Sequence, residues 1–367
     1  MEPRNATGGR RPTLRRTLIG GLVTAGLLGG LAYVARDTQD VDLAQAAQEP
    51  PVDDCGTRPP KPAPTTTTAP STTATTAPET TETTEVVSAV DAAAGGGSSG
   101  YWRCTFVEDF EGTELDTETW FVQTTTQGNF GVGGACFVDS PDNIAVGDGN
   151  LKLTVRKEVE PIACPRASNP TFVTPYTAGS IITRPKLDQT YGRYEIRARM
   201  PAAAVPGLHF AFWLWPRDLT TYPATFGEGD GDRWTNGELD VLEWYSRYPY
   251  HQVPYIHYAH TYAQTSTGRW VPNDPNITKA CLVGTMSEWH TFALEWTSSS
   301  IRMLYDGKVC LENTHWTPRN TTMPGPFDQP FMVSLTQGLG AIGTENQLVA
   351  QTPLPATAEV DYLKVWQ

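Results

Sequence analysis

The sequence predicts an all-β fold, a sandwich of two antiparallel sheets, for residues 101–367. Short segments of this region alternate between apolar and polar residues, as strands with one buried face do. No long segment combines helical periodicity with helix caps. All 11 tryptophans lie in this region, which therefore holds the large apolar side chains that the core of one large domain requires.

The expected strands share one pattern along the chain. Alternating segments occupy residues 150–156, 193–200, 291–296, 300–305 and 358–366. The fourth segment leads into Asp306-Gly307, a pair typical of hairpin turns. Many short strands joined by turns indicate two packed antiparallel sheets rather than a helical or mixed domain.

The first 100 residues differ from the rest in composition. Residues 1–36 are predicted to be an export signal or membrane anchor, because arginine pairs at 10–11 and 15–16 precede an uncharged apolar run over 18–35. This segment resembles a twin-arginine signal and is expected to be cleaved; left uncut, the run is just long enough to span a bilayer. Residues 37–100 are rich in Thr, Pro and Ala, which predicts a disordered linker that tethers the domain.

Charge and cysteine content narrow the class of protein. The formal net charge of −13 argues against nucleic acid, whose phosphates would be repelled, but has no effect on a neutral polysaccharide. The six cysteines form no Cys-x-x-Cys pair, so structural zinc spacings are absent. Export favours disulfides over buried unpaired cysteines, which are the alternative. The expected pairs are Cys55–Cys104, Cys136–Cys164 and Cys281–Cys310.

Three acids lie close together in the segment Glu238-Leu-Asp-Val-Leu-Glu243. In a regular strand, Glu238 and Asp240 project from the same face and Glu243 from the other. A β-bulge, which is favoured beside active sites, would return Glu243 to the first face. The three carboxyls would then line one face, with Leu239 and one of the two residues after Asp240 anchored in the core.

Clustered carboxyls repel one another and do not help folding, whereas a retaining glycosidase requires two of them about 5–5.5 Å apart. Like charges this close share a proton, so their pKa values spread apart. We assign Glu238 as the nucleophile, Glu243 as the general acid and then base, and Asp240 as the residue that positions Glu238. A solvated acidic strand or a set of calcium ligands is the alternative.

Aromatic residues surround the acid segment in the sequence. Residues 210–215 alternate, so their two tryptophans share a face. Indole rings stack on the C–H faces of sugars, and an apolar wall raises the pKa of an acid. Core packing or a structural role is the alternative for each of these residues. Candidate substrate contacts are Trp213, Trp215, Trp244 and His257, with Trp270 and His260 as weaker candidates.

The acid segment and several other motifs, in the expected order over most of residues 105–367, resemble glycoside hydrolase family 16 in its laminarinase-like β-glucanase branch. The further motifs are Val107-Glu-Asp-Phe110, Thr177-Ala-Gly-Ser-Ile-Ile-Thr183, Tyr191-Gly-Arg-Tyr-Glu-Ile-Arg-Ala-Arg-Met-Pro201, Phe212-Trp-Leu-Trp-Pro216, Trp289-His-Thr-Phe-Ala-Leu-Glu-Trp296, Phe327-Asp-Gln-Pro330 and Val360-Asp-Tyr-Leu-Lys-Val365. The resemblance implies a β-jelly-roll with a concave substrate cleft and net retention at the anomeric carbon.

The resemblance also implies the same three roles for the acids, tryptophans 213 and 215 beside the cleft, and His257 on the next cleft strand. It implies no cofactor for catalysis, but a structural calcium on the convex side, for which Glu108 and Asp361 are the candidate ligands. One departure from the family is an insertion over residues 217–236. This insertion is expected at the cleft rim, and its acids Glu228, Asp230 and Asp232 are expected to form a solvated loop rather than a cation site.

Taken together, the sequence predicts a secreted or surface-tethered, monomeric retaining endo-β-glycanase that acts on β-1,3-glucan, with mixed β-1,3-1,4 links as a further option. It contacts a membrane only if the N-terminal segment stays uncleaved. The alternatives are a galactan or agar hydrolase of the same fold, a glycan-binding relative without turnover, and a transglycosylase.

Overall fold

The computed structural model describes residues 55–56, 102–128, 130–183, 187–222, 236–259, 277–318 and 321–367. Within these residues the protein consists of β-strands and one short helix, α1 (Thr125–Gly128). The first and last strands of the folded region are neighbours, because β1 (Cys104–Glu108) pairs antiparallel with β16 (Ala356–Trp366). The predicted all-β fold is confirmed.

One sheet, here called the cleft sheet, has the strand order β11-β10-β9-β8-β15-β6. Its strands are β6 (Val173–Ile182), β8 (Leu208–Pro216), β9 (Glu238–Tyr245), β10 (His251–His257), β11 (Cys281–Leu282) and β15 (Phe331–Leu339). The short strands β2 (Phe121–Val122) and β3 (Cys136–Phe137) add to β6, with β3 parallel to it. The path from β11 to β6 is antiparallel throughout.

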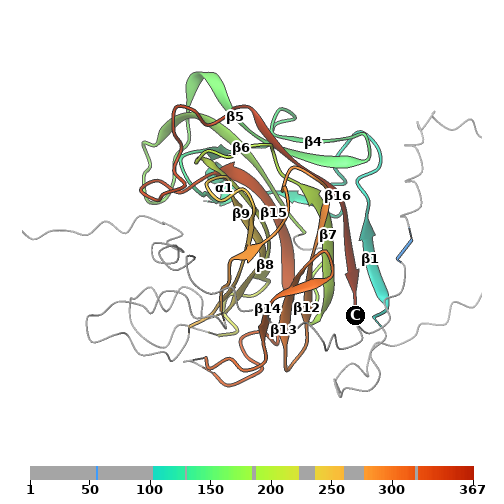
Figure 1. Ribbon diagram of the computed structural model, residues 1–367. Helices are drawn as coiled ribbons and strands as arrows, with labels where there is room; N and C mark the ends of the chain where they lie inside the picture. The colour runs from blue at the N-terminus through green and yellow to red at the C-terminus, as the bar shows by residue number, and fades with distance from the viewer. Residues whose placement is uncertain are drawn as a thin grey trace, which may run out of the picture.

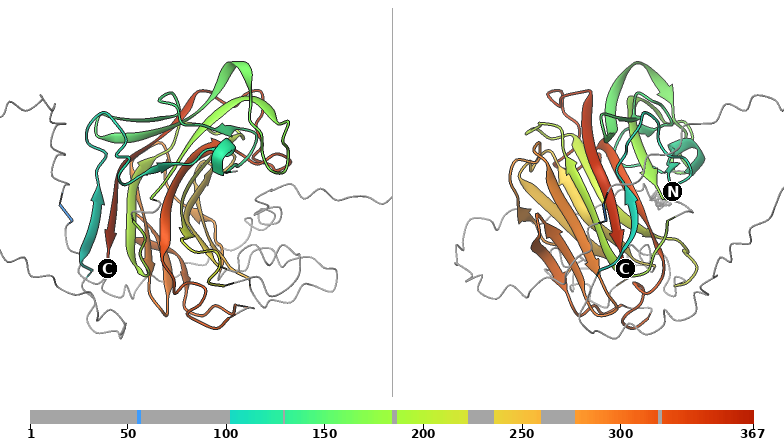
Figure 2. Two further views of the ribbon diagram at one scale, coloured as in Figure 1. Left: turned by 180° about the vertical axis from the view of Figure 1, so that it is seen from behind. Right: turned by 90° about the vertical axis from the view of Figure 1, so that its right-hand side faces the viewer.

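The other sheet, here called the outer sheet, has the order β5-β16-β7-β12-β13-β14, with β4 beside β5 and β1 beside β16. Its further strands are β4 (Ile144–Gly147), β5 (Asn150–Ala163), β7 (Gly192–Arg199), β12 (His290–Trp296), β13 (Ile301–Tyr305) and β14 (Lys308–Asn313). The predicted hairpin turn lies between β13 and β14, where Asp306 and Gly307 have φ angles of 44° and 73°. Figures 1 and 2 show the two curved sheets packed face to face.

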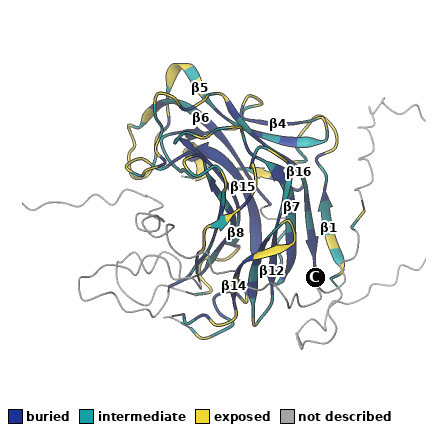
Figure 3. Ribbon diagram, in the orientation of Figure 1, coloured by how far each residue is buried: buried dark blue, intermediate teal, exposed yellow. Residues whose placement is uncertain are grey.

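The long strand β5 connects the sheets. Its first residues pair with β16, whereas Arg156 to Ala163 pair with β6. Alternation along β5 directs Leu151, Leu153 and Val155, each 0% exposed, into the layer between the sheets. Figure 3 shows this layer as the buried centre of the molecule. The architecture is the sandwich that the alternating segments predict.

All three expected disulfides are present among the described residues. Cys55–Cys104, Cys136–Cys164 and Cys281–Cys310 have Cα–Cα distances of 5.2, 5.9 and 5.8 Å, inside the usual range for a disulfide. The first pair fastens residue 55 to β1 of the outer sheet. The second joins the end of β5 to β3, beside the loop that carries one wall of the cleft.

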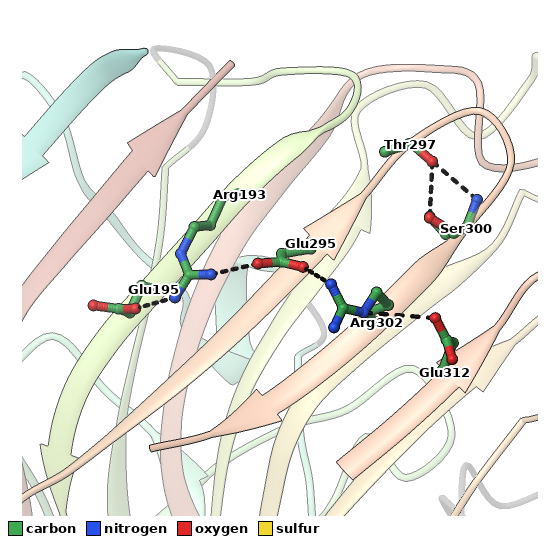
Figure 4. A network of polar contacts seen from close by, with 7 residues as sticks. All are labelled: Arg193, Glu195, Glu295, Thr297, Ser300, Arg302 and Glu312. Atoms are coloured by element: carbon green, nitrogen blue, oxygen red, sulfur yellow. Dashed lines mark hydrogen bonds and ion pairs between the residues drawn. The ribbon is translucent and has the colours of Figure 1, made fainter. Parts of the chain in front are cut away.

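The face of the outer sheet turned away from the core carries a network of charged side chains (Figure 4). Glu295 on β12 accepts hydrogen bonds from Arg193 on β7 at 2.5 Å and from Arg302 on β13 at 2.6 Å. Arg193 also contacts Glu195 at 2.6 Å, and Arg302 lies 3.6 Å from Glu312. The network links four adjacent strands, and its centre, Glu295, is almost fully buried.

The N-terminal predictions fall outside the structure. Residues 1–36 and residues 37–100, except Cys55 and Gly56, lie outside the described residues. In the part of the chain that is described, no helix has the length and apolar character needed to cross a bilayer.

Candidate active site

An open cleft with a volume of about 550 Å³ lies over the face of the cleft sheet opposite the core. This is within the usual size range of ligand sites. Alternation along β8 explains which of its residues form the floor of the cleft: every second residue from 209 to 215 lines the cleft, and the residues between them are buried in the core.

Arg217 and Leu219, at the start of the insertion, also line the cleft. The described part of the insertion therefore lies at the rim, as expected, while residues 223–235 lie outside the described residues.

The bulge predicted between Asp240 and Glu243 is present in β9. On the β10 side, Glu243 pairs with Val253 and Asp240 with Tyr255, so β9 takes three steps where β10 takes two. On the β8 side, the register shifts at the same place. Because one extra residue restores the alternation, Glu238, Asp240 and Glu243 all line the cleft.

The extra residue is accommodated by burying two consecutive side chains. Val241 and Leu242 are both 0% exposed and both belong to the hydrophobic core, together with Leu239. The apolar residues of the segment therefore hold the strand against the core while its acids face the cleft.

The residue before the acids fixes how β9 begins. Gly237 has a φ of +81°, and a Cβ there would lie 2.7 Å from Cε1 of the buried Phe327. Only glycine fits this conformation and this space without strain. The neighbouring Asn236 ties the two described ends of the insertion together, because its side chain bonds Leu219 O, Tyr222 O and Tyr222 N. Glu238 therefore starts from a fixed backbone.

Asp240 lies in a buried, paired environment. Its Oδ2 is 3.1 Å from Nε2 of His257, and their side chains are 7% and 15% exposed. His257 in turn stacks on Tyr255 with ring centroids 3.8 Å apart. Burial, and then the negative charge of Glu243, raise the pKa of Asp240 well above its usual value. Burial thus favours the protonated form of Asp240.

Glu243 has the opposite electrostatic environment. His209 Nε2 lies 3.1 Å from its Oε1, and the Tyr245 hydroxyl donates to the same oxygen at 2.6 Å. Burial raises the pKa of Glu243, but the hydrogen bond and charge of His209, the hydrogen bond of Tyr245 and the charge of His257 outweigh burial and lower it. The pKa values of Asp240 and Glu243 are therefore shifted in opposite directions.

Sequence reasoning misses His209 and Tyr245. The signal for both is the two-residue period: His209 precedes Trp213 by four residues on β8, and Tyr245 follows Glu243 by two on β9. The sequence prediction starts the first of these strands at Phe210, one residue too late to include His209.

Two of the predicted tryptophans form a wall of the cleft. Trp213 and Trp215 line it with their rings 5.9 Å apart. The Trp213 indole N–H donates to Thr336 on β15 at 3.2 Å, and its ring stacks on Phe130 with centroids 6.1 Å apart and an interplanar angle of 11°. Phe130 also lines the cleft and is a wall residue that the sequence does not reveal.

The prediction that Trp244 contacts substrate is wrong. Its side chain is 1% exposed and belongs to the hydrophobic core. The reason is alternation after the bulge: because Glu243 and Tyr245 face the cleft, the residue between them faces the other way. His260 and Trp270 lie outside the described residues.

The two candidate calcium ligands do not fit a cation site. Glu108 is buried, and its two oxygens accept hydrogen bonds from the Phe110 N–H and the Trp120 indole N–H. Asp361 forms an ion pair with Arg197. Among the described residues, no group of three or more His, Cys, Asp or Glu side chains could hold a metal ion. A structural calcium stays a prediction without a site in this part of the chain.

A concave cleft over one sheet of a β-sandwich, with three carboxyls on a bulged strand and indole rings beside them, is the site of a glycoside hydrolase. The model of the glycosyl hydrolases family 16 matches residues 135–348. The chain belongs to this family.

Individual relatives agree with this assignment. The chain is 28% identical over 286 residues to a β-glucanase of Rhodothermus marinus, a match that covers 73% of this chain and 86% of that protein. It is 26% identical over 278 residues to glucan endo-1,3-β-glucosidase A1 of Niallia circulans, a match that covers 71% of this chain but only 37% of the relative. The X-ray structure of the laminarinase from Rhodothermus marinus superposes with a TM-score of 0.56 at 24% identity, over 72% of this chain and 97% of that one. This structural likeness supports the fold.

Proposed function

We propose that the protein is a secreted or surface-tethered endo-β-1,3-glucanase that works with retention of configuration. The observation that carries the proposal is the bulge in β9, which brings Glu238, Asp240 and Glu243 to one cleft floor. Two relatives, a β-glucanase and a glucan endo-1,3-β-glucosidase, support β-glucan as the substrate class. An open cleft suits an internal stretch of a polysaccharide.

In the proposed first step, Glu243 donates a proton to the glycosidic oxygen while a carboxylate oxygen of Glu238 attacks the anomeric carbon. The bond to the leaving sugar breaks and an ester to Glu238 forms. Asp240 is two residues from Glu238 on the same face, and His257 is the register partner of Glu238 on β10. Asp240, held by His257, is therefore suited to position the nucleophile.

In the proposed second step, Glu243 acts as a carboxylate and takes a proton from water, whose oxygen attacks the anomeric carbon. The ester bond breaks, and Glu238 returns as a carboxylate. Two inversions at the same carbon give net retention. These steps use only carboxyl chemistry and require no cofactor.

The domain organisation that goes with this proposal is an N-terminal signal or anchor over residues 1–36, a linker over 37–100 and the catalytic domain over 101–367. Three disulfides in the described residues are compatible with an oxidising, extracellular location. The protein is proposed to act as a monomer.

The experiment that tests the function measures release of reducing ends from laminarin, lichenan, agarose and galactan by wild-type protein and by Glu238→Ala. The proposal expects hydrolysis of laminarin by wild type and loss of it in the variant. Equal, negligible release by both proteins on all four glycans would contradict the enzyme and favour a binding module. Release of reducing ends from agarose or galactan alone would show that the substrate is one of these glycans rather than β-glucan. Redistribution of chain length without net release would indicate transglycosylation.

A further inference from the structure

Two donors from different strands converge on a single oxygen of Glu243. Oε1 receives the Tyr245 hydroxyl from the same strand at 2.6 Å and faces His209 Nε2 from β8 at 3.1 Å. The His209 and Tyr245 rings stack on each other with centroids 4.7 Å apart and an interplanar angle of 24°. The two side chains therefore support each other as well as the carboxyl group.

From this geometry we propose that His209 and Tyr245 are positioning residues for Glu243, which hold its Oε1 and direct Oε2 to the substrate. The inference rests on the proposed function, because it assigns a purpose to the environment of the proposed acid and base. It adds two residues to that site and specifies which oxygen of Glu243 transfers the proton.

The surroundings of His209 determine which ring nitrogen contacts Glu243. The ring is buried, and among the described residues its Nδ1 has no hydrogen-bond partner. Its Nε2 lies 3.1 Å from Oε1 of Glu243. A hydrogen bond donated by Nε2 and the hydrogen bond from the Tyr245 hydroxyl both stabilise a carboxylate rather than a carboxylic acid.

Titratable groups lie around Glu243 on each neighbouring strand. His209 comes from β8 and His257 from β10, while Glu238, Asp240 and Tyr245 come from β9 itself. Burial opposes ionisation of Glu243, and the two histidines and Tyr245 favour it with the larger combined effect, so that its pKa is lowered.

For the reaction, the two carboxyl oxygens of Glu243 have different roles. The first step needs a proton on Glu243, so donors that favour the ionised form shift the alkaline side of the kcat/KM profile to lower pH. In the second step the same donors stabilise the carboxylate that acts as the base. Because Oε1 is occupied by protein donors, Oε2 is the atom left for the glycosidic oxygen and for water.

The test is a titration of the Glu243 carboxyl group by ¹³C NMR in the full-length protein, with the resonance assigned through Glu243→Gln. Tyr245→Phe removes one hydroxyl and should raise the pKa of Glu243 by about one pH unit, the size expected for a hydrogen bond to a charged group. His209→Leu should raise the pKa as well, whereas His209→Gln keeps an N–H donor and should restore most of the wild-type value.

The matched control is Tyr248→Phe. The Tyr248 hydroxyl also donates to a glutamate, Glu345, at 2.6 Å, but it lies outside the cleft lining. This variant should leave the Glu243 titration unchanged. An identical Glu243 pKa in wild type and Tyr245→Phe would overturn the inference. If His209→Leu does not fold, the comparison of wild type with Tyr245→Phe is sufficient to test it.

A kinetic readout separates this inference from the proposed function. On laminarin, the alkaline side of the kcat/KM profile should move to higher pH in Tyr245→Phe, a shift that a loss of packing alone would not produce. If wild type cleaves no β-glucan while the NMR shift is present, the proposed substrate is wrong and the inference about Glu243 stands. If wild type cleaves laminarin and neither measurement moves, the function stands and the inference is wrong.

Discussion

The carboxyl group of Asp240 lies 3.1 Å from the imidazole of His257, and both side chains are largely buried. Burial raises the pKa of Asp240 more than any other effect, and the charge of Glu243 raises it further. In the unfolded chain an aspartate loses its proton near pH 3.9. The folded protein therefore holds this proton up to a higher pH than the unfolded chain does.

This difference predicts how stability depends on pH. Above the unfolded pKa, and until the raised folded pKa is passed, each increase in pH destabilises wild type relative to a variant without this proton. The melting temperature of Asp240→Asn, measured by circular dichroism, should therefore increase relative to that of wild type as the pH rises from 4 towards 8.

A suitable control for this measurement is Asp218→Asn. Asp218 is exposed, and hydrogen bonds from Thr220 lower its pKa. Its contribution is lost only as the pH falls through the lowered pKa, so the melting-temperature difference for this variant should stay flat from pH 5 to 8. A flat profile for Asp240→Asn as well would show that Asp240 is not protonated in the folded protein.

The general acid is tested by the choice of leaving group. Glu243→Gln should lose about 10²–10⁴-fold of kcat on laminarin, the usual contribution of general acid catalysis. On dinitrophenyl β-glucosides, whose leaving group needs no proton, the loss in the first step should be far smaller. Steady-state and burst kinetics on both substrates measure this difference, and equal losses on both would remove the acid role from Glu243.

The steric requirement at Gly237 gives a prediction with an internal control. Gly237→Ala places a methyl group 2.7 Å from the buried ring of Phe327, whereas Gly343, with a similar positive φ of 84°, has open space at the same position. Both variants carry backbone strain of about 1–3 kcal/mol, but only Gly237→Ala must also displace Phe327. Urea unfolding should show the larger loss for Gly237→Ala, together with reduced activity. Equal losses in stability would show that Phe327 does not restrict this site.

The network on the outer sheet predicts that replacing a buried glutamate lowers the free energy of unfolding more than replacing an exposed one (Figure 4). Glu295 is 5% exposed and bonds both Arg193 and Arg302. Glu295→Ala should cost about 3 kcal/mol, because it leaves the two arginines with only Glu195 and Glu312 as partners. Glu312 is 54% exposed, and Glu312→Ala should cost less than about 1 kcal/mol. Chemical denaturation compares the two. Equal losses would mean that the charges around Glu295 are compensated by water.

Sequence reasoning succeeds where a pattern is local. Glu238 and Asp240 are two residues apart and share a strand face, whereas Glu243 is three residues beyond Asp240 and would face the other way. A bulge is the simplest way to put all three acids on one face, and the pairing of β9 with β10 contains this bulge. Alternation likewise predicts tryptophans 213 and 215 in the cleft. The same rule, continued past the bulge, would have assigned Trp244 to the core.

Other features depend on contacts between distant segments. Phe130 is far from Trp213 in the sequence, and its place in the cleft depends on how the chain before β3 folds onto β8. His209 contacts Glu243 only because β8 and β9 are neighbours in register. The calcium prediction rests on resemblance alone, and the oxygens of Glu108 are bonded to Phe110 and Trp120 instead.

The central claim is that the bulge lets Glu238 and Glu243 act on one glycosidic bond as nucleophile and acid. The most direct measurement is ¹H NMR of the anomeric protons during the first minutes of laminarin hydrolysis, before mutarotation. Initial release of the β-anomer, lost in Glu238→Ala, is the predicted result. Initial release of the α-anomer would mean that water attacks directly, and would contradict the account.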